Sequence, residues 1–314
     1  MLQSGSSVVL RDAGGFTRVV NKLDEKQSYK VGRISIPGKA IVGRRYGETV
    51  SRSGEDWVRC QPTVVEQALD AVSESDTEPD SRAVQSAMQS ETFASKTIFS
   101  QEKYLLKKHK KYAAEVTLLE PTVMNLTEVQ GSVIRWDAVG LILRYANATA
   151  TSKVLVWDDA MGLTTAALLQ RGCHVTRLTA GKGSNSAKGI LELAVATDSL
   201  TDCRLSEHDK IDYYDSLVIV NTESIVDVSL DDIVEKTLGC VSSSCGVVTI
   251  YSRHFEAASD LQKRFRLARE FINVTMTETF FREHQIMDQR THPLMQSEID
   301  LCQGFIVTCM KVKE

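Results

Sequence analysis

The sequence predicts an α/β protein of two domains, in which a small antiparallel β domain precedes a larger domain with a mainly parallel sheet. Three observations support this prediction. The chain has 314 residues, about twice the usual length of one domain. Its first sixty residues hold short apolar segments between turn residues, and from residue 153 onward apolar strands alternate with helical segments.

The composition excludes several classes of protein. Hydrophobic residues make up 42% and charged residues 25% of the chain, as in ordinary globular proteins. No apolar run approaches the roughly 18 residues needed to span a bilayer, so we expect no membrane partner. The net charge of −4 argues against a uniformly basic nucleic-acid-binding protein, although basic charge can still be concentrated locally.

Residues 1–60 are predicted to form the small β domain. Segments 7–11 and 16–20 flank a hairpin-type connection, Asp12-Ala13-Gly14-Gly15. Segments 29–36, 40–42 and 57–59 follow between turn residues such as Pro37-Gly38. This spacing indicates a small barrel or sandwich.

Residues 61–94 differ in character from both neighbouring regions. Six acidic residues and no basic ones occur between residues 61 and 81, among Ser, Thr and Pro. The composition predicts a solvated acidic linker.

A basic helix is predicted to open the third region, residues 95–314. Ser100 is a suitable N-cap, and Glu102 complements the helix dipole in the first turn. One helical stripe holds four lysines, Lys103, Lys107, Lys110 and Lys111, and a fifth, Lys108, lies beside it. Such a stripe is often only a solvated face. Because it reverses the charge of an acidic chain, it also suits nucleic-acid phosphates, with Tyr104 and Tyr112 available for stacking.

The remainder of the chain predicts a doubly wound sheet. Strands are expected at 153–157, 174–179, 216–220, 246–251, 274–281 and 305–312, with helices at 162–171, 230–238 and 257–271. This alternation indicates a mainly parallel sheet with an antiparallel edge. It is the outline of a Rossmann-like class I methyltransferase fold, although Rossmann dehydrogenases begin similarly.

The features that would hold a nucleotide cofactor are missing in three places. After the first strand, Asp158 and Asp159 lead through Met161 to a single glycine, Gly162, where a glycine-rich turn is expected. The second strand ends without an acid for ribose hydroxyls. The strand at 216–220 has no following motif to hold a target base. We therefore interpret the turn as a degenerate cofactor loop, and the two aspartates as a polar strand end.

No other catalytic or metal site is indicated. The seven cysteines are odd in number and mostly isolated, and the pair Cys240 and Cys245 matches no zinc spacing. Reduced structural thiols suit a nuclear or cytosolic compartment. The six histidines have no partners at diagnostic spacings, and Gly181-Lys182-Gly183-Ser184 lacks the spacing of a phosphate loop.

Three stretches resemble the non-catalytic subunit of the eukaryotic tRNA adenine-58 N1-methyltransferase. Ser95-Lys96-Thr97-Ile98-Phe99-Ser100 with the lysine-rich segment that follows is the most specific of them. Lys30-Val31-Gly32-Arg33 with Ile41-Val42-Gly43-Arg44-Arg45 is similar to the family's barrel segment. Arg282-Glu283-His284 with Arg290-Thr291-His292 is similar to its C-terminal motif. The chain departs from the family in its acidic stretch after the barrel and in its short Cys302-Gln303-Gly304 segment.

The resemblance implies a pseudo-enzyme without catalytic residues. It implies a homologous catalytic partner that carries S-adenosylmethionine, a heterotetramer that methylates N1 of a T-loop adenine in tRNA, and a nuclear location with the cytosol as the alternative. The lysine stripe would bind tRNA, Arg44 and Arg45 would be weaker RNA contacts, and Arg290, Thr291 and His292 would serve an interface or the fold. Two alternatives remain open: an active S-adenosylmethionine-dependent RNA methyltransferase with an atypical pocket, and a scaffold that binds no RNA.

Overall fold

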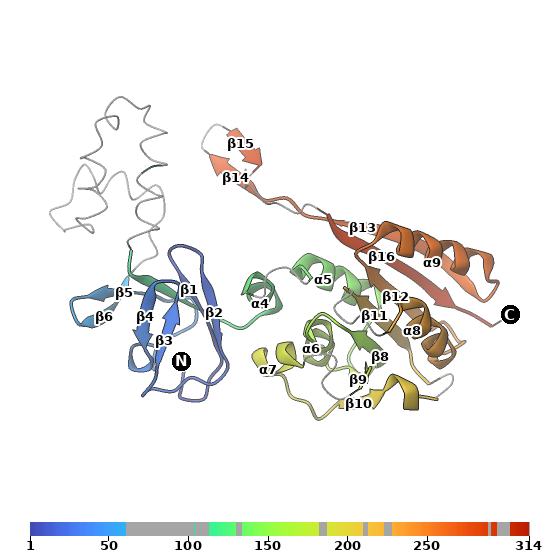
Figure 1. Ribbon diagram of the computed structural model, residues 1–314, viewed down its shortest axis with the longest axis horizontal. Helices are drawn as coiled ribbons and strands as arrows, with labels where there is room; N and C mark the ends of the chain where they lie inside the picture. Colours follow the sequence, from blue (N-terminus) through green and yellow to red (C-terminus); the bar gives the residue numbers. More distant parts are fainter. Residues whose placement is uncertain are drawn as a thin grey trace. The chain divides into compact units, whose positions relative to one another are not determined.

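A computed structural model describes residues 1–60, 104, 113–129, 134–181, 187–209, 213–222, 228–287, 290–293 and 302–313. These residues form two compact units, Met1–Val129 and Gln130–Glu314 (Figure 1). The predicted linker, residues 61–94, lies outside the described residues, and so does the basic helix apart from Tyr104.

The first unit is built on a five-stranded antiparallel sheet and a separate hairpin. The sheet order is β2-β1-β7-β5-β6, formed by β1 (Val8–Asp12), β2 (Thr17–Val20), β5 (Thr49–Ser53), β6 (Asp56–Cys60) and β7 (Glu115–Leu119). Strands β3 (Ser28–Val31) and β4 (Ile34–Pro37) pair with each other. Alternate residues such as Leu10, Val31 and Leu118 point inward and are at most 1% exposed, so one core joins both sheets.

Two features of this unit differ from the prediction. Strand β7 pairs with β1 and β5, so the division between the units falls after Val129 rather than at residue 95. The predicted strand at 40–42 is instead the end of a short 3₁₀ helix, η1 (Gly38–Ala40), and the turn that follows. This turn requires glycine at position 38, because a Cβ there would lie 2.0 Å from the carbonyl oxygen of Asp24. A short helix α4 (Val123–Val129) closes the unit.

The second unit contains a seven-stranded sheet of the predicted kind. Its order is β10-β9-β8-β11-β12-β16-β13, in which the first five strands are parallel and β16 is antiparallel to both of its neighbours. The strands are β8 (Lys153–Asp158), β9 (His174–Thr179), β10 (Leu200–Arg204), β11 (Ser216–Asn221), β12 (Val247–Ser252), β13 (Phe271–Phe280) and β16 (Cys302–Lys311).

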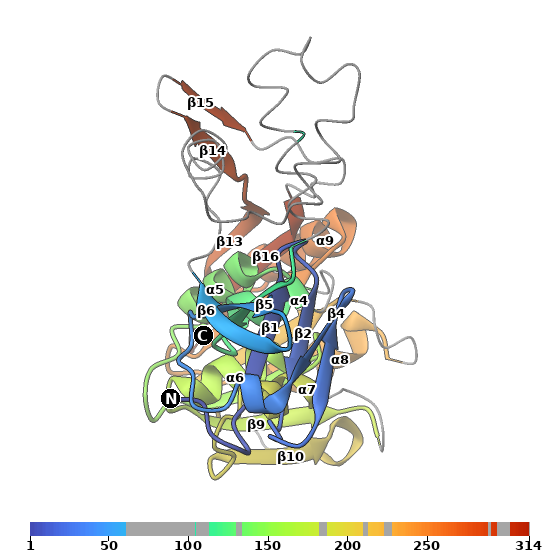
Figure 2. The ribbon, with the colours of Figure 1, turned by 90° about the vertical axis from the view of Figure 1, so that its left-hand side faces the viewer.

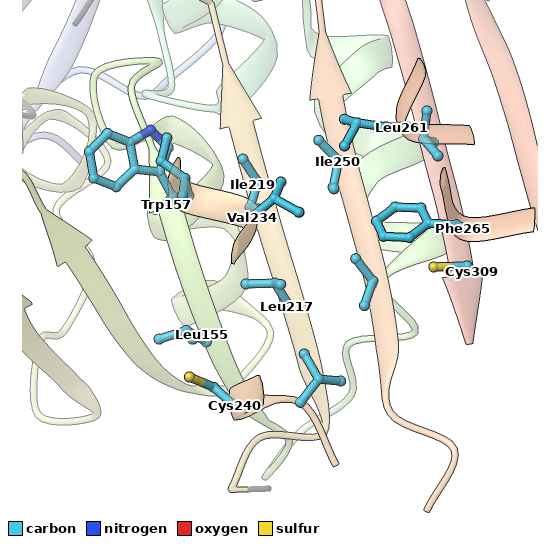
Figure 3. Close-up of a cluster of buried hydrophobic side chains, with 14 of the residues drawn as sticks. Leu155, Trp157, Leu217, Ile219, Val234, Cys240, Ile250, Leu261, Phe265 and Cys309 are labelled. Atoms are coloured by element: carbon cyan, nitrogen blue, oxygen red, sulfur yellow. The ribbon is translucent and has the colours of Figure 1, made fainter. Parts of the chain in front are cut away.

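Helices cover both faces of this sheet. Side chains of α8 (Leu230–Thr237) and α9 (Phe255–Leu267) pack on one face, in a cluster that also holds Leu155 and Trp157 of β8 (Figure 3). Because side chains alternate along a strand, Val154 and Val156 point to the other face, where α5 (Trp136–Tyr145) and α6 (Leu163–Gln170) lie. Shorter helical segments are α7 (Lys188–Glu192), η2 (Leu205–Glu207) and η3 (Leu238–Cys240). None of the helices in the described ranges is long and apolar enough to cross a membrane.

A two-stranded hairpin is inserted between β13 and β16. It consists of β14 (His284–Met287) and β15 (Arg290–Pro293), paired in antiparallel register. Within the second unit the hairpin extends beyond the end of β13, away from the helices that cover the sheet (Figures 1 and 2).

Candidate functional site

The strand order places a candidate site between β8 and β11. From β8 the chain builds outward through β9 and β10 on one side, and through β11 and β12 on the other. In open α/β sheets, ligands bind at the carboxyl ends of the strands where the order reverses in this way. The residues after Asp158 and Asn221 therefore decide what this crevice can hold.

Asp158 is the last residue of β8 and is completely buried. Its carboxylate accepts hydrogen bonds from the amide of Ala160 at 3.0 Å, and from the amide and hydroxyl of Thr165 at 2.8 and 2.9 Å. Burial raises the pKa of Asp158, while the hydrogen bonds from Thr165 and Ala160 and the charge of Arg177 act against that rise. The carboxylate thus fixes the turn that leads from β8 into α6.

Asp159 joins the two sides of the crevice. Both of its carboxylate oxygens lie 2.8 Å from the amide of Thr222, the residue after β11. Its own amide donates to the carbonyl of Val220 at 3.3 Å. Asp159 is 5% exposed, so its carboxylate bridges the ends of β8 and β11 in a buried position.

The turn after Asp159 is held in place by helix α7. Met161 and Gly162 both have positive φ, 56° and 76°. The carbonyl of Met161 accepts a hydrogen bond from Gly189 of α7 at 2.8 Å. A Cβ at Gly189 would lie 3.0 Å from both the Met161 carbonyl and the Leu163 amide, so glycine here lets α7 reach the turn.

The end of the second strand also lacks a free acid for a ribose. Asp202 of the neighbouring strand β10 is bound by the guanidinium of Arg177 through two hydrogen bonds of 2.8 Å. The Arg177 side chain is 6% exposed, and its second terminal nitrogen finds no partner among the described residues. Asp202 is thus already paired within the sheet and is not available to ribose hydroxyls in this arrangement.

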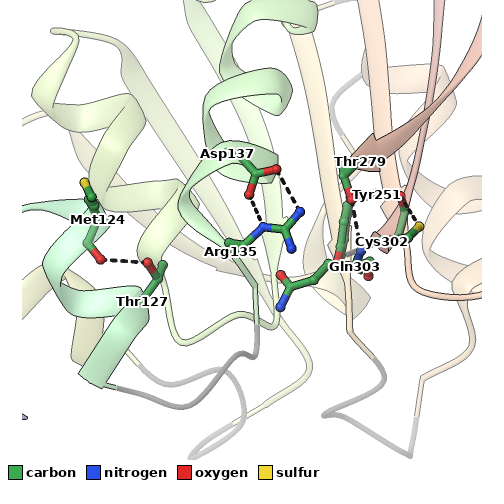
Figure 4. Close-up of polar contacts among 9 residues, drawn as sticks. Met124, Thr127, Arg135, Asp137, Tyr251, Thr279, Cys302 and Gln303 are labelled. Atoms are coloured by element: carbon green, nitrogen blue, oxygen red, sulfur yellow. Dashed lines mark hydrogen bonds and ion pairs between the residues drawn. The ribbon is translucent and has the colours of Figure 1, made fainter. Parts of the chain in front are cut away.

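A second polar cluster lies at the start of β16 and was not expected from the sequence (Figure 4). Thr279 receives a hydrogen bond from the amide of Gln303 and donates to the carbonyl of Gly304, and Tyr251 donates to the carbonyl of Gln303 at 2.8 Å. A Cβ at Gly304 would lie 2.7 Å from the carbonyl oxygen of Ser252. These contacts explain why glycine is needed at position 304, where β16 passes close to the backbone of β12.

An aromatic and charged group at the start of α5 was likewise missed. Arg135 pairs with Asp137 through contacts of 2.5 and 3.0 Å, and its guanidinium lies 5.4 Å from the ring of Phe281. Trp136 packs edge-on against the same ring at 5.1 Å. No sequence motif predicts this group, because its members are separated by about half of the chain.

The predicted RNA-binding residues lie partly outside the described residues. Lys103, Lys107, Lys108, Lys110, Lys111 and Tyr112 fall there, and Tyr104 is half-buried. Arg44 donates to the carbonyl of Trp57 at 3.2 Å and lies 4.0 Å from Glu48. Arg45 is exposed and makes no ion pair within the described residues. Residues 1–60 carry eleven Lys and Arg against six Asp and Glu, so this domain is basic.

The C-terminal motif forms strand β15. Arg290, Thr291 and His292 pair with Met287, Ile286 and Gln285 of β14, and the side chains of Thr291 and His292 are exposed. The motif therefore builds the hairpin through its main chain and presents two polar side chains.

Among the described residues, no group of three or more His, Cys, Asp or Glu side chains is arranged to hold a metal ion. None of the seven cysteines forms a disulfide.

The sheet order and the helices on both faces define a class I methyltransferase-like fold, in which a hydrogen bond from Thr222 to Asp159 bridges the strand ends at the switch point. Solved structures agree on the fold. Over its full length the chain resembles a SAM-dependent O-methyltransferase from Thermotoga maritima, with TM-score 0.66, 11% identity and 95% of that chain covered. It also resembles the tRNA (m1A58) methyltransferase TrmI from Aquifex aeolicus, with TM-score 0.63, 12% identity and 99% of that chain covered.

The chain belongs to the Gcd10p family, whose model matches residues 83–280. It is 28% identical over 295 residues to the tRNA (adenine(58)-N(1))-methyltransferase non-catalytic subunit trm6 of Dictyostelium discoideum, covering 71% of this chain and 56% of that protein. It is 36% identical over 89 residues to the corresponding subunit of Mus musculus, covering 26% of this chain and 18% of that protein. The chain thus spans about half the length of its Dictyostelium relative. The predicted fold class and the family resemblance are both confirmed.

Proposed function

We propose that the chain is a non-catalytic, tRNA-binding subunit of a tRNA adenine-58 N1-methyltransferase. Membership of the Gcd10p family and the name of the Dictyostelium relative support the assignment to tRNA adenine-58 N1-methylation. The observation that carries the non-catalytic role is the hydrogen bond from Thr222 to Asp159, which closes the crevice between β8 and β11. In this proposal a homologous partner binds S-adenosylmethionine, the two chains assemble as a heterotetramer, and the complex acts in the nucleus.

Calorimetry with S-adenosylmethionine tests whether the cofactor binds to this chain or only to its catalytic partner. The full chain is titrated alone, and in complex with a co-expressed homologous catalytic subunit. We expect no heat of binding from the chain alone and saturable binding by the complex. Micromolar binding by the chain alone would instead establish the alternative of an active methyltransferase with an atypical pocket. A methyl-transfer assay on tRNA, with and without this chain, then shows whether the partner depends on it.

RNA binding is assigned first to the lysine stripe. Replacing Lys103, Lys107, Lys108, Lys110 and Lys111 by alanine should weaken tRNA binding by the complex. For every lysine that binds a phosphate, its removal should reduce the slope of log K against log salt by about 1. The matched control is Lys263→Ala, which removes an exposed lysine from α9. Equal salt slopes for the five-lysine variant and the control would favour the alternative of a scaffold without RNA binding.

Arg44 and Arg45 provide an internal comparison in the basic N-terminal unit. Arg45 is exposed, so Arg45→Ala should weaken tRNA binding without changing stability. Arg44 is tied to the carbonyl of Trp57, so Arg44→Ala should lower the unfolding free energy by about 1 kcal/mol. Equal affinities for tRNA in wild type and Arg45→Ala would remove Arg45 from the interface.

The β14–β15 hairpin is assigned to the subunit interface. Its projection beyond β13 and the exposed side chains of Thr291 and His292 support this assignment. Replacing both residues by arginine should reduce co-purification of the catalytic subunit while leaving the fold of the chain intact by circular dichroism. Undiminished co-purification would restrict the motif to a structural role.

A further inference from the structure

A hollow opens at the edge of the large sheet opposite the closed crevice. It has a volume of about 330 Å³ and lies at the amino ends of β8 and β9, beside the start of β10 and the turn before β11. This volume is at the lower end of the range for small-molecule sites, which is about 300–1,000 Å³. Lys153, the first residue of β8, lines the hollow, whereas Asp158 at the other end of β8 belongs to the crevice. At a rise of roughly 3.3 Å per residue the two sites are about 17 Å apart.

Aromatic side chains supply an apolar surface in this hollow. Tyr213 is 46% exposed, and its ring packs edge-on against Tyr214 at a centroid distance of 5.1 Å. Tyr214 is 1% exposed and holds this pair against the domain core. The exposed ring is anchored at its base and offers the kind of surface on which a nucleobase stacks.

Positive charge lies next to this ring. The ammonium group of Lys153 is 4.4 Å from the centroid of the Tyr213 ring, at cation–π distance. The exposed His174 also lines the hollow. A phosphate attached to a stacked base would meet the Lys153 charge without a large movement of the chain.

Hydrogen-bonding groups complete the lining. Asp198 and Thr201 are exposed and lie on the side formed by β10 and the residues before it. A carboxylate accepts from the amino or imino groups of a base, and a hydroxyl can donate or accept. Stacking, cationic and hydrogen-bonding groups therefore converge on one small space.

We propose that this hollow binds a nucleotide, with the base stacked on Tyr213 and the phosphate beside Lys153. The nucleotide can be a free mononucleotide or an unpaired nucleotide of an RNA. The hollow shares no residue with the crevice between β8 and β11 or with the lysine stripe, so the proposal does not rest on the proposed function of the chain.

Calorimetric titration of the full chain with AMP, adenosine and a single-stranded oligoadenylate tests this proposal. AMP should bind severalfold more tightly than adenosine, because only AMP carries the phosphate. Tyr213→Ala should weaken AMP binding by about tenfold or more, the typical cost of removing one stacking partner. Tyr213→Phe should retain binding, and Lys153→Ala should abolish the preference for AMP over adenosine. Tighter binding of the oligonucleotide than of AMP, reduced to the same extent by Tyr213→Ala, would identify RNA as the source, and equal binding would identify a free nucleotide.

The matched control is Phe255→Ala at the other end of the sheet. Phe255 is 51% exposed and packs edge-on against Phe305 at 5.4 Å, much as Tyr213 packs against Tyr214. The control should leave AMP affinity unchanged. The proposal is overturned if neither AMP nor the oligonucleotide binds, or if Tyr213→Ala binds AMP as tightly as wild type. Either result leaves the lysine-stripe experiment on tRNA binding unaffected.

Discussion

Replacing Asp158 by alanine removes one acceptor that serves three donors at the end of β8. The amides of Ala160 and Thr165 and the hydroxyl of Thr165 would lose their partner in a completely buried place. A buried donor without an acceptor costs about 1–3 kcal/mol, so the gross penalty is about 3–9 kcal/mol. The variant also removes a buried charge, whose cost is visible in the raised pKa of Asp158. The net loss of unfolding free energy should therefore lie near the lower end, about 3 kcal/mol.

Asp158→Asn separates the hydrogen bonds from the charge. The amide keeps the size of the side chain but offers one acceptor oxygen instead of two, so we expect a loss of about 1–2 kcal/mol at neutral pH. Burial raises the pKa of Asp158 above 3.8 in the folded state, so the folded protein binds more protons than the unfolded chain between the two pKa values. The contribution of Asp158 to stability is then complete below pH 3.8 and declines as pH rises through the folded pKa. The advantage of wild type over Asp158→Asn should shrink across that window.

Urea unfolding followed by tryptophan fluorescence measures these differences, because Trp157 adjoins Asp158 and is 1% exposed. Asp215→Ala is the control. Its carboxylate is exposed and accepts one hydrogen bond, from the amide of Lys153 at 2.8 Å, so its loss should cost about 1 kcal/mol or less. An Asp158→Ala variant no less stable than Asp215→Ala would refute the closed turn. A wild-type advantage over Asp158→Asn that grows with pH would refute the raised pKa.

Three further changes have definite expected outcomes. Gly38→Ala should destabilise the N-terminal unit by more than about 2 kcal/mol in thermal unfolding, because the new Cβ would lie 2.0 Å from a backbone oxygen, that of Asp24. Gly304→Ala should lower the unfolding temperature of the second unit, because its Cβ would lie 2.7 Å from the backbone of β12. An unchanged unfolding temperature would mean that the two strands move apart to accommodate the methyl group. Burial raises the pKa of the Cys309 thiol to about 12, so iodoacetamide at pH 8 should modify the exposed Cys245 and spare Cys309 in the folded protein, as peptide mass mapping can show.

The parallel strands were predicted well because their signal is local. The segment 174–179 was predicted at its observed bounds, and 153–157 missed only Asp158 of β8. The segment 153–157 is a short run of mainly apolar residues, as expected for a strand buried on two faces. The segment 174–179 is more polar, with Val175 and Leu178 as its apolar residues. The same reasoning missed β10, whose sequence Leu200–Arg204 is largely polar because it is an edge strand.

Elements with weak or distant signals were not predictable. Helix α5 begins after Arg135, which makes no side-chain cap, so its start carries no sequence marker. Strand β7 enters the first sheet between β1 and β5 after more than fifty intervening residues. Its position depends on tertiary pairing with Val50 and Leu10, which a local pattern cannot contain.

For the crevice, the sequence shows that the usual glycines are missing, and the structure shows which hydrogen bonds the residues there make instead. The single glycine predicted a degenerate turn, and the two aspartates were interpreted only as a polar strand end. Asp158 is bonded within the turn to Thr165, and Asp159 is bonded to Thr222, 63 residues further along the chain. Such partners become visible only once β8 and β11 are known to be neighbours.

Two independent features distinguish the crevice between β8 and β11 from a glycine-rich cofactor site. One is the absence of glycines, which leaves Met161 in the turn. The other is the bond between Asp159 and Thr222, which joins the strand ends with two short distances of 2.8 Å. Restoring glycines at positions 160 and 161 would leave that bond in place, since it involves neither residue. Conversely, removing Asp159 would leave the turn held by the hydrogen bond from the amide of Gly189 to the carbonyl of Met161. Under the proposed non-catalytic role, neither change alone should give the isolated chain measurable binding of S-adenosylmethionine in calorimetry.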